Sequence, residues 1–227
     1  MKASYFLNVK QIVRNIIYLV VLITISSGYG GSFDDFFSAV RTDDTEAIRA
    51  LLRRGFDVNT VDATGEPGLL LAVRQSSIKV ATLLVDWPQT KIEVRSRQDE
   101  SPLMLASLKG LAQLCDALIA RGADVNKPGW TPLHYAATNG HLPVLHLLLE
   151  NHAYIDAASP NGTTPLMMAA RYGSAASVSL LLEAGADPLL KNDQGLSAID
   201  FAHRAERKDS AELIAGSIRA RHPKGVW

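Results

Sequence analysis

The stretch Thr131-Pro132-Leu133-His134-Tyr135-Ala136-Ala137 returns almost unchanged at residues 164–170, as Thr-Pro-Leu-Met-Met-Ala-Ala. One alanine of this phrase recurs at spacings of 33, 34, 30, 33 and 33 residues, at Ala39, Ala72, Ala106, Ala136, Ala169 and Ala202. A fixed period of this size indicates a solenoid, in which similar units stack along one axis. We therefore expect a quasi-linear stack of repeated units.

The phrase itself predicts the start of a short helix. Thr131 suits an N-cap, where its hydroxyl accepts a hydrogen bond from a backbone N–H, and Pro132 fits the first helical position, where its missing N–H costs little. Gly140 is expected to end this helix, and apolar residues at helical spacing predict a second helix that begins near His141. Each repeat should thus be a pair of helices, which makes the fold class all-α.

A second phrase, Gly-Ala-Asp, follows the second helix in several repeats. Gly122 and Gly185 stand where a left-handed residue would end that helix. His152 occupies the same position, and because histidine tolerates positive φ less well than glycine, it predicts a strained turn. Residues 86–91 lack the phrase altogether. The loop before the fourth repeat is short and contains Pro128, which should stiffen it.

The period divides the chain into six repeats. They start near Phe33, Gly65, Asp99, Gly129, Gly162 and Gly195. The first and last repeats are atypical and polar, as the ends of a solenoid need to be. No long spacer separates the repeats, so residues 31–227 are expected to form one domain.

The phrases at 131–137 and 164–170 resemble those of ankyrin repeats, and the likeness extends from Phe33 to Arg219. It implies an ankyrin-repeat solenoid of stacked helix-turn-helix pairs with short hairpin or loop fingers. It also implies a concave groove, built from the finger tips and the exposed ends of the first helices. The longer stretches 127–137 and 159–173 are similar to those of small exported ankyrin proteins of Gram-negative bacteria. That narrower resemblance implies a periplasmic protein that protects or regulates a partner.

Residues 1–30 belong to a different physical class. Lys2, Lys10 and Arg14 are followed by the apolar run 16–25, and the segment ends in small residues. This order is typical of a secretory signal peptide, and the apolar run is shorter than the roughly 20 residues of a membrane span. Because no Ala-x-Ala site is present, an uncleaved N-terminal membrane anchor is the alternative. Either form predicts export of the residues after Ser32, with membrane contact only through this segment. The residues alone fit export to the endoplasmic reticulum equally well, and it is the resemblance to the bacterial proteins that implies the periplasm.

Charge and cysteine content narrow the possible functions. The chain has 23 basic and 23 acidic residues, so that without the three basic residues of the N-terminal segment its net charge is −3. This balance gives no indication of nucleic-acid binding. Cys115 is the sole cysteine, which rules out an intrachain disulfide, and its position in a second helix predicts a small buried side chain.

The sequence contains no pattern typical of catalysis or cofactor binding. His141 and His146 are five residues apart, rather than the three or four that place two metal ligands on one helical face. The chain has no H-E-x-x-H, G-x-S-x-G or Gly-rich phosphate-binding loop. We therefore expect neither an enzyme nor a cofactor.

The repeat geometry predicts instead a surface that binds another protein. Arg41, Arg74, Arg171 and Arg204 each stand two residues after the recurring alanine, and this basic ladder would suit an acidic partner surface. Trp130, beside the shortened finger, is the expected centre of the contact, since tryptophan, tyrosine and arginine dominate interface hot spots. The predicted partner-binding residues are Trp130, Arg74, Lys109, Arg171, Tyr172, Arg41, Arg97, Glu66, Glu100 and Asn139.

The sequence thus favours a monomeric, non-catalytic protein–protein interaction module. One alternative is an immunity protein that neutralises a periplasmic toxin. Another is a protein that binds an anionic small molecule in the basic groove, for which a closed pocket with converging polar groups would be the evidence.

Overall fold

The computed structural model describes residues 31–221, so the predicted N-terminal export segment lies outside the described residues. Residues 31–41 are helical. The helices that follow are α2 Thr45–Arg53, α3 Gly68–Gln75, α4 Ile78–Asp86, α5 Pro102–Leu108, α6 Ala112–Ala120, α7 Pro132–Asn139, α8 Leu142–Glu150, α9 Pro165–Tyr172, α10 Ala175–Glu183, α11 Ala198–Arg204 and α12 Lys208–Arg221. Strand pairing within residues 31–221 is limited to an isolated antiparallel bridge between Val61 and Pro67. The predicted all-α class is confirmed.

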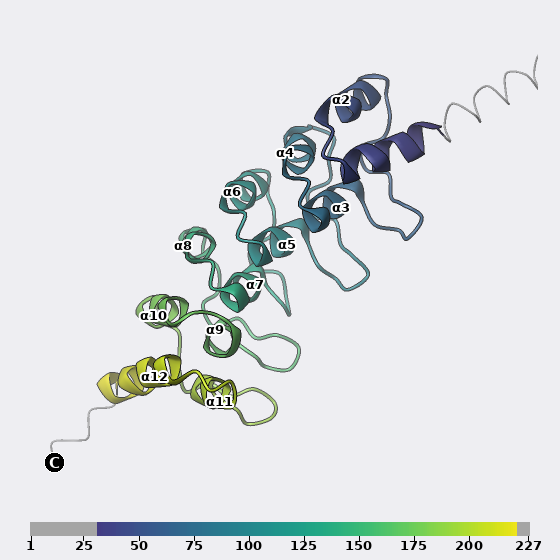
Figure 1. The fold of residues 1–227 in the computed structure, drawn as a ribbon. Helices are drawn as coiled ribbons and strands as arrows, with labels where there is room; N and C mark the ends of the chain where they lie inside the picture. Colours follow the sequence, from purple (N-terminus) through teal and green to yellow (C-terminus); the bar gives the residue numbers. More distant parts are fainter. Residues whose placement is uncertain (1–30, 222–227) are drawn as a thin grey trace, which may run out of the picture.

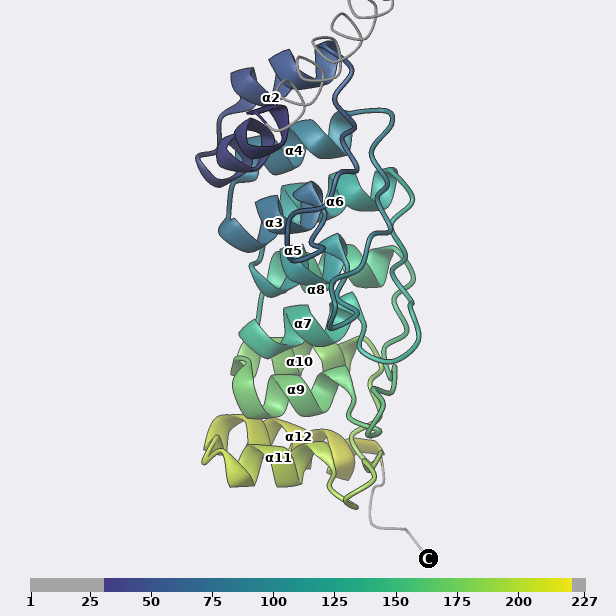
Figure 2. The ribbon, with the colours of Figure 1, turned by 90° about the vertical axis from the view of Figure 1, so that its right-hand side faces the viewer.

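The helices form two layers that stack along one axis (Figures 1 and 2). The inner layer contains residues 31–41, α3, α5, α7, α9 and α11, and the outer layer contains α2, α4, α6, α8, α10 and α12. The loop before each inner helix forms a finger, and the fingers project on the side of the inner helices (Figure 1). Figure 2 shows these loops running along one edge of the stack. This is the solenoid of helix pairs that the period predicts.

In the inner helices α5, α7, α9 and α11, the residue three positions after the N-cap forms a capping box with it. Met167 Sδ accepts a hydrogen bond from the Thr164 N–H at 3.4 Å, and the Thr164 hydroxyl accepts one from the Met167 N–H at 3.3 Å. In the fourth repeat His134 Nδ1 accepts from the Thr131 N–H at 3.2 Å. The Thr131 hydroxyl lies 2.9 Å from the same nitrogen, and Thr131 and His134 form a capping box. The N-cap predicted at Thr131 is confirmed.

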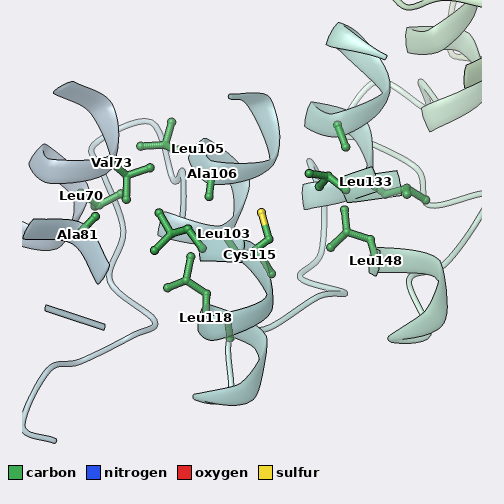
Figure 3. Packing of buried hydrophobic residues seen from close by; sticks show 14 of the residues in the cluster. Leu70, Val73, Ala81, Leu103, Leu105, Ala106, Cys115, Leu118, Leu133 and Leu148 are labelled. Carbon is green, nitrogen blue, oxygen red and sulfur yellow. The ribbon is translucent and has the colours of Figure 1, made fainter. Parts of the chain in front are cut away.

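The core runs continuously from repeat to repeat. Leu133 and Leu166 are fully buried at equivalent positions of α7 and α9. Figure 3 shows Leu103 and Leu118 facing each other from the two helices of one repeat, with Cys115 beside them. Cys115 is buried as predicted, its Sγ lies 3.8 Å from the Ser107 hydroxyl, and burial raises its pKa to about 12. It is therefore a packed thiol with little thiolate character.

Five non-glycine residues between 31 and 221 adopt the left-handed backbone conformation, namely Asp43, Ser76, Asp99, His152 and Glu206. Two of them stand where the repeat usually has glycine. His152 has a φ of 62°, which confirms the strained turn expected there. Asp99 has the same φ of 62° at the tip of the third finger, where the neighbouring fingers carry Gly65 and Gly129. Asp99 is held by Lys127, whose hydrogen bond lowers the pKa of the Asp99 carboxyl. An ion pair between fingers thus accompanies the strained tip.

The exit of the second repeat, which lacks Gly-Ala-Asp, is held by an arginine of the next repeat. The Arg121 guanidinium donates to the carbonyl oxygens of Val85, Trp87, Pro88 and Thr90. The Trp87 contact is 3.3 Å long, and the Pro88 and Thr90 contacts are each 3.4 Å long. These bonds tie the exit of the second repeat to the third repeat.

Candidate partner-binding surface

The inner helices and the fingers together form the surface that we call the inner face. Nine of the ten predicted partner-binding residues lie at the last turn of an inner helix, at the residue after it, or on a finger, and Arg41 ends the first helical segment. The repeat geometry therefore brings them to one side of the molecule. Their environments nevertheless differ, and the differences decide which of them remain available for a partner.

Arg74 is committed to an internal ion-pair network. Its Nε lies 2.8 Å from Glu66 Oε1 and its Nη2 lies 3.0 Å from Glu100 Oε2. Burial lowers the pKa of Arg74, but the hydrogen bonds from the two carboxylates outweigh this effect and raise it overall. Two finger residues thus neutralise Arg74, which distinguishes it from the other arginines of the basic ladder, and its predicted part in a partner contact stays a prediction.

The same network shapes the nearby part of the inner face. Arg97 is exposed and borders an open hollow between the second and third fingers, together with Thr64, Ser96 and Gln98. Arg74 and Glu66 also line this hollow. It contains charges of both signs, so its electrostatic character is mixed rather than basic.

Lys109 and Asn139 connect neighbouring repeats. Lys109 Nζ donates to the Ser76 hydroxyl at 2.9 Å, and Asn139 Nδ2 donates to the Leu108 carbonyl oxygen at 2.7 Å. His141 Nε2 lies 3.0 Å from the same carbonyl. Lys109 and Asn139 are exposed, yet Lys109 Nζ and Asn139 Nδ2 already have hydrogen-bond partners within the stack.

Trp130 is half-buried on the fourth finger. Its ring meets the ring of His134 edge-on, with centroids 5.2 Å apart and an interplanar angle of 75°. Part of the indole thus packs on the molecule itself and part remains accessible. Its predicted role at the centre of a partner contact stays a prediction.

Arg171 and Tyr172 end helix α9 and face solvent. Tyr172 is 51% exposed, and the Arg171 guanidinium carbon lies 5.1 Å from the centre of its ring. This distance is within the range of a cation–π contact. Arg171 has no ion pair within residues 31–221, and neither has Arg204 in the next repeat. Arg41 is also exposed. Burial raises the pKa of the Asp62 carboxyl, but hydrogen bonds from Thr64 and the Glu66 backbone, with a smaller contribution from the Arg41 charge, lower it overall.

Sequence reasoning missed two polar residues beside the Arg74 network. Tyr135 is half-buried near Glu100, and burial followed by the Glu100 charge raises the pKa of its phenol. Lys127 pairs with Asp99 and donates to the Pro128 carbonyl oxygen at 3.0 Å. Lys127 follows the end of the Gly-Ala-Asp-Val-Asn phrase, but nothing in the sequence indicates that it reaches the preceding finger.

Two observations on the described residues concern titratable groups. Burial lowers the pKa of His134 to about 4, so its ring is neutral at physiological pH and serves as a bridge between repeats. The described part of the chain contains no group of three or more His, Cys, Asp or Glu side chains that could hold a metal ion. No helix between residues 31 and 221 is long and apolar enough to cross a membrane.

Comparisons with known proteins agree with this architecture. A family model described as ankyrin repeats (3 copies) matches residues 36–128 and 89–159, and one described as ankyrin repeats (many copies) matches residues 153–202. The nuclear factor NF-kappa-B p105 subunit of Gallus gallus is 32% identical over 169 residues, covering 71% of this chain and 17% of that protein. The p105 subunit of Mus musculus is 32% identical over 155 residues, covering 65% and 16%. The chain thus spans less than a fifth of these curated relatives.

Two similar solved structures come from bacteria. The first is the complex of the predatory endopeptidase Bd0816 of Bdellovibrio bacteriovorus with immunity protein Bd3460, one chain of which matches with 27% identity and a TM-score of 0.70, covering 80% of this chain and 97% of that chain. The second is an ankyrin repeat domain of Acinetobacter baumannii AYE, with 24% identity and a TM-score of 0.70, covering 80% and 96%. Ankyrin repeats are in general non-catalytic modules of protein–protein interaction. With family models spanning residues 36–202, the chain belongs to the ankyrin-repeat family.

Proposed function

We propose that this chain is an exported, non-catalytic binding protein that protects or regulates a partner protein through its inner face. The observation that carries the proposal is the accessible aromatic and basic surface of that face, above all Tyr172 at 51% exposure beside Arg171. Tyrosine, tryptophan and arginine are the residues that contribute most to interface energies. The half-buried Trp130 adds a second aromatic contact on the neighbouring repeat.

The shape of the surface supports a protein partner over a small anionic ligand. Four hollows on the described part of the chain are open to solvent and have volumes of about 190 to 320 Å³. None of these four brings together converging polar groups in an enclosed space, which is the usual form of a small-molecule site. A long, open face of stacked repeats suits a protein surface better.

The periplasm is the location we propose, on the basis of the basic and apolar pattern of residues 1–30. The experiment compares the full chain with a variant that lacks these residues, each carrying a C-terminal tag, in the bacterium that encodes the chain. We expect the full chain in the periplasmic fraction, with a partner protein captured on it and identified by mass spectrometry. The shortened variant should remain in the cytoplasm. Retention of the full chain in the cytoplasm would refute the proposed location, and failure to capture a protein would refute the binding function.

A second candidate is an immunity protein that neutralises a toxin acting in the periplasm. It is favoured by the similarity to one chain of the Bdellovibrio complex of an endopeptidase with an immunity protein. Deleting the gene would then make cells sensitive to a toxin encoded beside it. Normal growth of the deletion strain while that toxin is produced would exclude this candidate and leave the first one standing.

A further inference from the structure

Arg74 and Arg171 occupy the same position in two repeats. Each stands two residues after the recurring alanine, Ala72 in α3 and Ala169 in α9. Arg74 meets two carboxylates, at 2.8 Å from Glu66 of its own finger and at 3.0 Å from Glu100 of the next finger. Both glutamates come directly after the tip residue with positive φ. The repeat therefore provides two defined positions from which an arginine at this place can be neutralised.

The corresponding positions around Arg171 carry no carboxylate. They follow the tips Gly162 and Gly195, and they hold Thr163 and Leu196. Thr163 is buried, and its carbonyl oxygen receives the hydrogen bond of His134 Nε2, while Leu196 is half-buried. Arg171 is consequently exposed, and no acidic side chain pairs with it within residues 31–221.

The next repeat extends this region with a second unpaired cation. Arg204 of α11 stands two residues after Ala202, is exposed, and comes from the inner helix that packs against α9. The acidic Asp200 on the same helix is already used, since its Oδ2 accepts from the Ser197 N–H at 2.8 Å and from the Ser197 hydroxyl at 2.7 Å. The Arg171 guanidinium is held near the Tyr172 ring, so less side-chain entropy is lost when it binds.

We propose that Arg171, Tyr172 and Arg204, which we call the C-terminal cation site, bind a carboxylate side chain of the partner protein. The partner's Asp or Glu takes the place beside Arg171 that Glu66 and Glu100 take beside Arg74. The exposed Tyr172 ring packs on apolar surface of the partner next to that carboxylate. Arginine forms paired, directional hydrogen bonds with carboxylates, which favours this ligand. The inference rests on the proposed binding function and names the contact and the chemistry of the partner.

The test supplies the missing carboxylate from within the chain. Leu196→Glu places an acid at the position equivalent to Glu100, where it should neutralise Arg171 internally. The matched control is Leu196→Gln, which has nearly the same size and no charge. The probe is the purified protein captured on the wild-type chain, and its affinity is measured by calorimetry at low and moderate salt. We expect Leu196→Glu to lose about tenfold or more in affinity, and Leu196→Gln to bind nearly as well as the wild type.

Two exposed arginines keep the test independent of any packing change at Leu196. Arg171→Gln and Arg204→Gln should each weaken binding and flatten its salt dependence, whereas Lys79→Glu, on the exposed outer side of α4, should change neither. Equal affinities for Leu196→Glu and Leu196→Gln, or unchanged binding by both arginine variants, would overturn the cation site and leave the binding function intact. Capture of a nuclease-sensitive polymer in place of a protein would overturn both.

Discussion

His134 donates a hydrogen bond from Nε2 to the Thr163 carbonyl oxygen, 2.9 Å away in the finger of the next repeat. The direction of this bond follows from the other ring nitrogen, because Nδ1 accepts from the Thr131 N–H at 3.2 Å and so carries no proton. The ring is fully buried between α7 and the fifth finger. A neutral histidine therefore joins two repeats, and protonation would break one of its bonds.

The stability of the repeat stack should fall as the solution becomes acidic. Burial lowers the pKa of His134 from 6.5 to about 4, so below pH 6.5 the unfolded chain binds a proton that the folded chain does not. We expect the free energy of unfolding to drop by about 2 kcal/mol between pH 7 and pH 5 on this account. Urea titrations at several pH values measure it. His134→Met copies the residue at Met167 and should remove most of this dependence, so parallel pH profiles for variant and wild type would contradict the assignment.

Leu166→Ala should destabilise the stack by about 2–5 kcal/mol, the usual cost of a cavity in a packed core. Leu166 is fully buried in α9, between the fourth and sixth repeats. Since stacked repeats share their interfaces, the loss should also appear in hydrogen exchange of α7 and α11. The control is Leu213→Ala on the exposed side of α12, where the side chain is 37% exposed and little change is expected. A similar melting temperature for Leu166→Ala and wild type would mean that Leu166 does not support the core.

The starts and ends of the helices could be predicted from the sequence because they depend on residues that are neighbours in the chain. The proline at the first helical position and the glycine after the second helix set backbone dihedrals directly, and His152 could be recognised as strained because it replaced that glycine. The class of fold followed from the period, since one helix pair cannot bury its apolar face without neighbours.

Whether a surface arginine is paired with a carboxylate could not be predicted in the same way. Arg74 and Arg171 look identical in the repeat, and the difference lies in whether Glu100, 26 residues away, or Leu196 occupies the facing finger. No pattern of neighbouring residues indicates that a long side chain will contact a residue of another repeat. The same holds for Arg121, which holds a loop more than 30 residues earlier in the chain.

Arg121→Lys should destabilise the second repeat more than a conservative change suggests. The planar guanidinium donates hydrogen bonds to the carbonyl oxygens of Trp87, Pro88 and Thr90 as well as to that of Val85. A lysine ammonium lacks the forked set of N–H donors that reaches several acceptors at once. Val85 and Thr90 are buried, and a buried carbonyl left without a donor costs about 1–3 kcal/mol. Chemical denaturation gives the total loss, and hydrogen exchange should locate it in residues 84–92. Arg53→Lys, on the exposed end of α2, is the control. Equal losses for both variants would show that the fork has no special role.

Arg74→Ala should loosen the second and third fingers without unfolding the stack. Arg74 bridges Glu66 and Glu100, and its removal leaves these two carboxylates without the cation between them. More than a third of the Arg74 side chain is exposed, so solvent screens each pair and the global loss should be about 1 kcal/mol or less. Hydrogen exchange should become faster in residues 61–67 and 95–101. The matched variant is Arg171→Ala, which occupies the same position in α9 and has no carboxylate to release, so exchange in its fingers should not change. Faster exchange in the fingers around both arginines would mean that loss of the ion pairs is not the cause of the loosening. Unchanged exchange around Arg74 would mean that its ion pairs do not order the fingers.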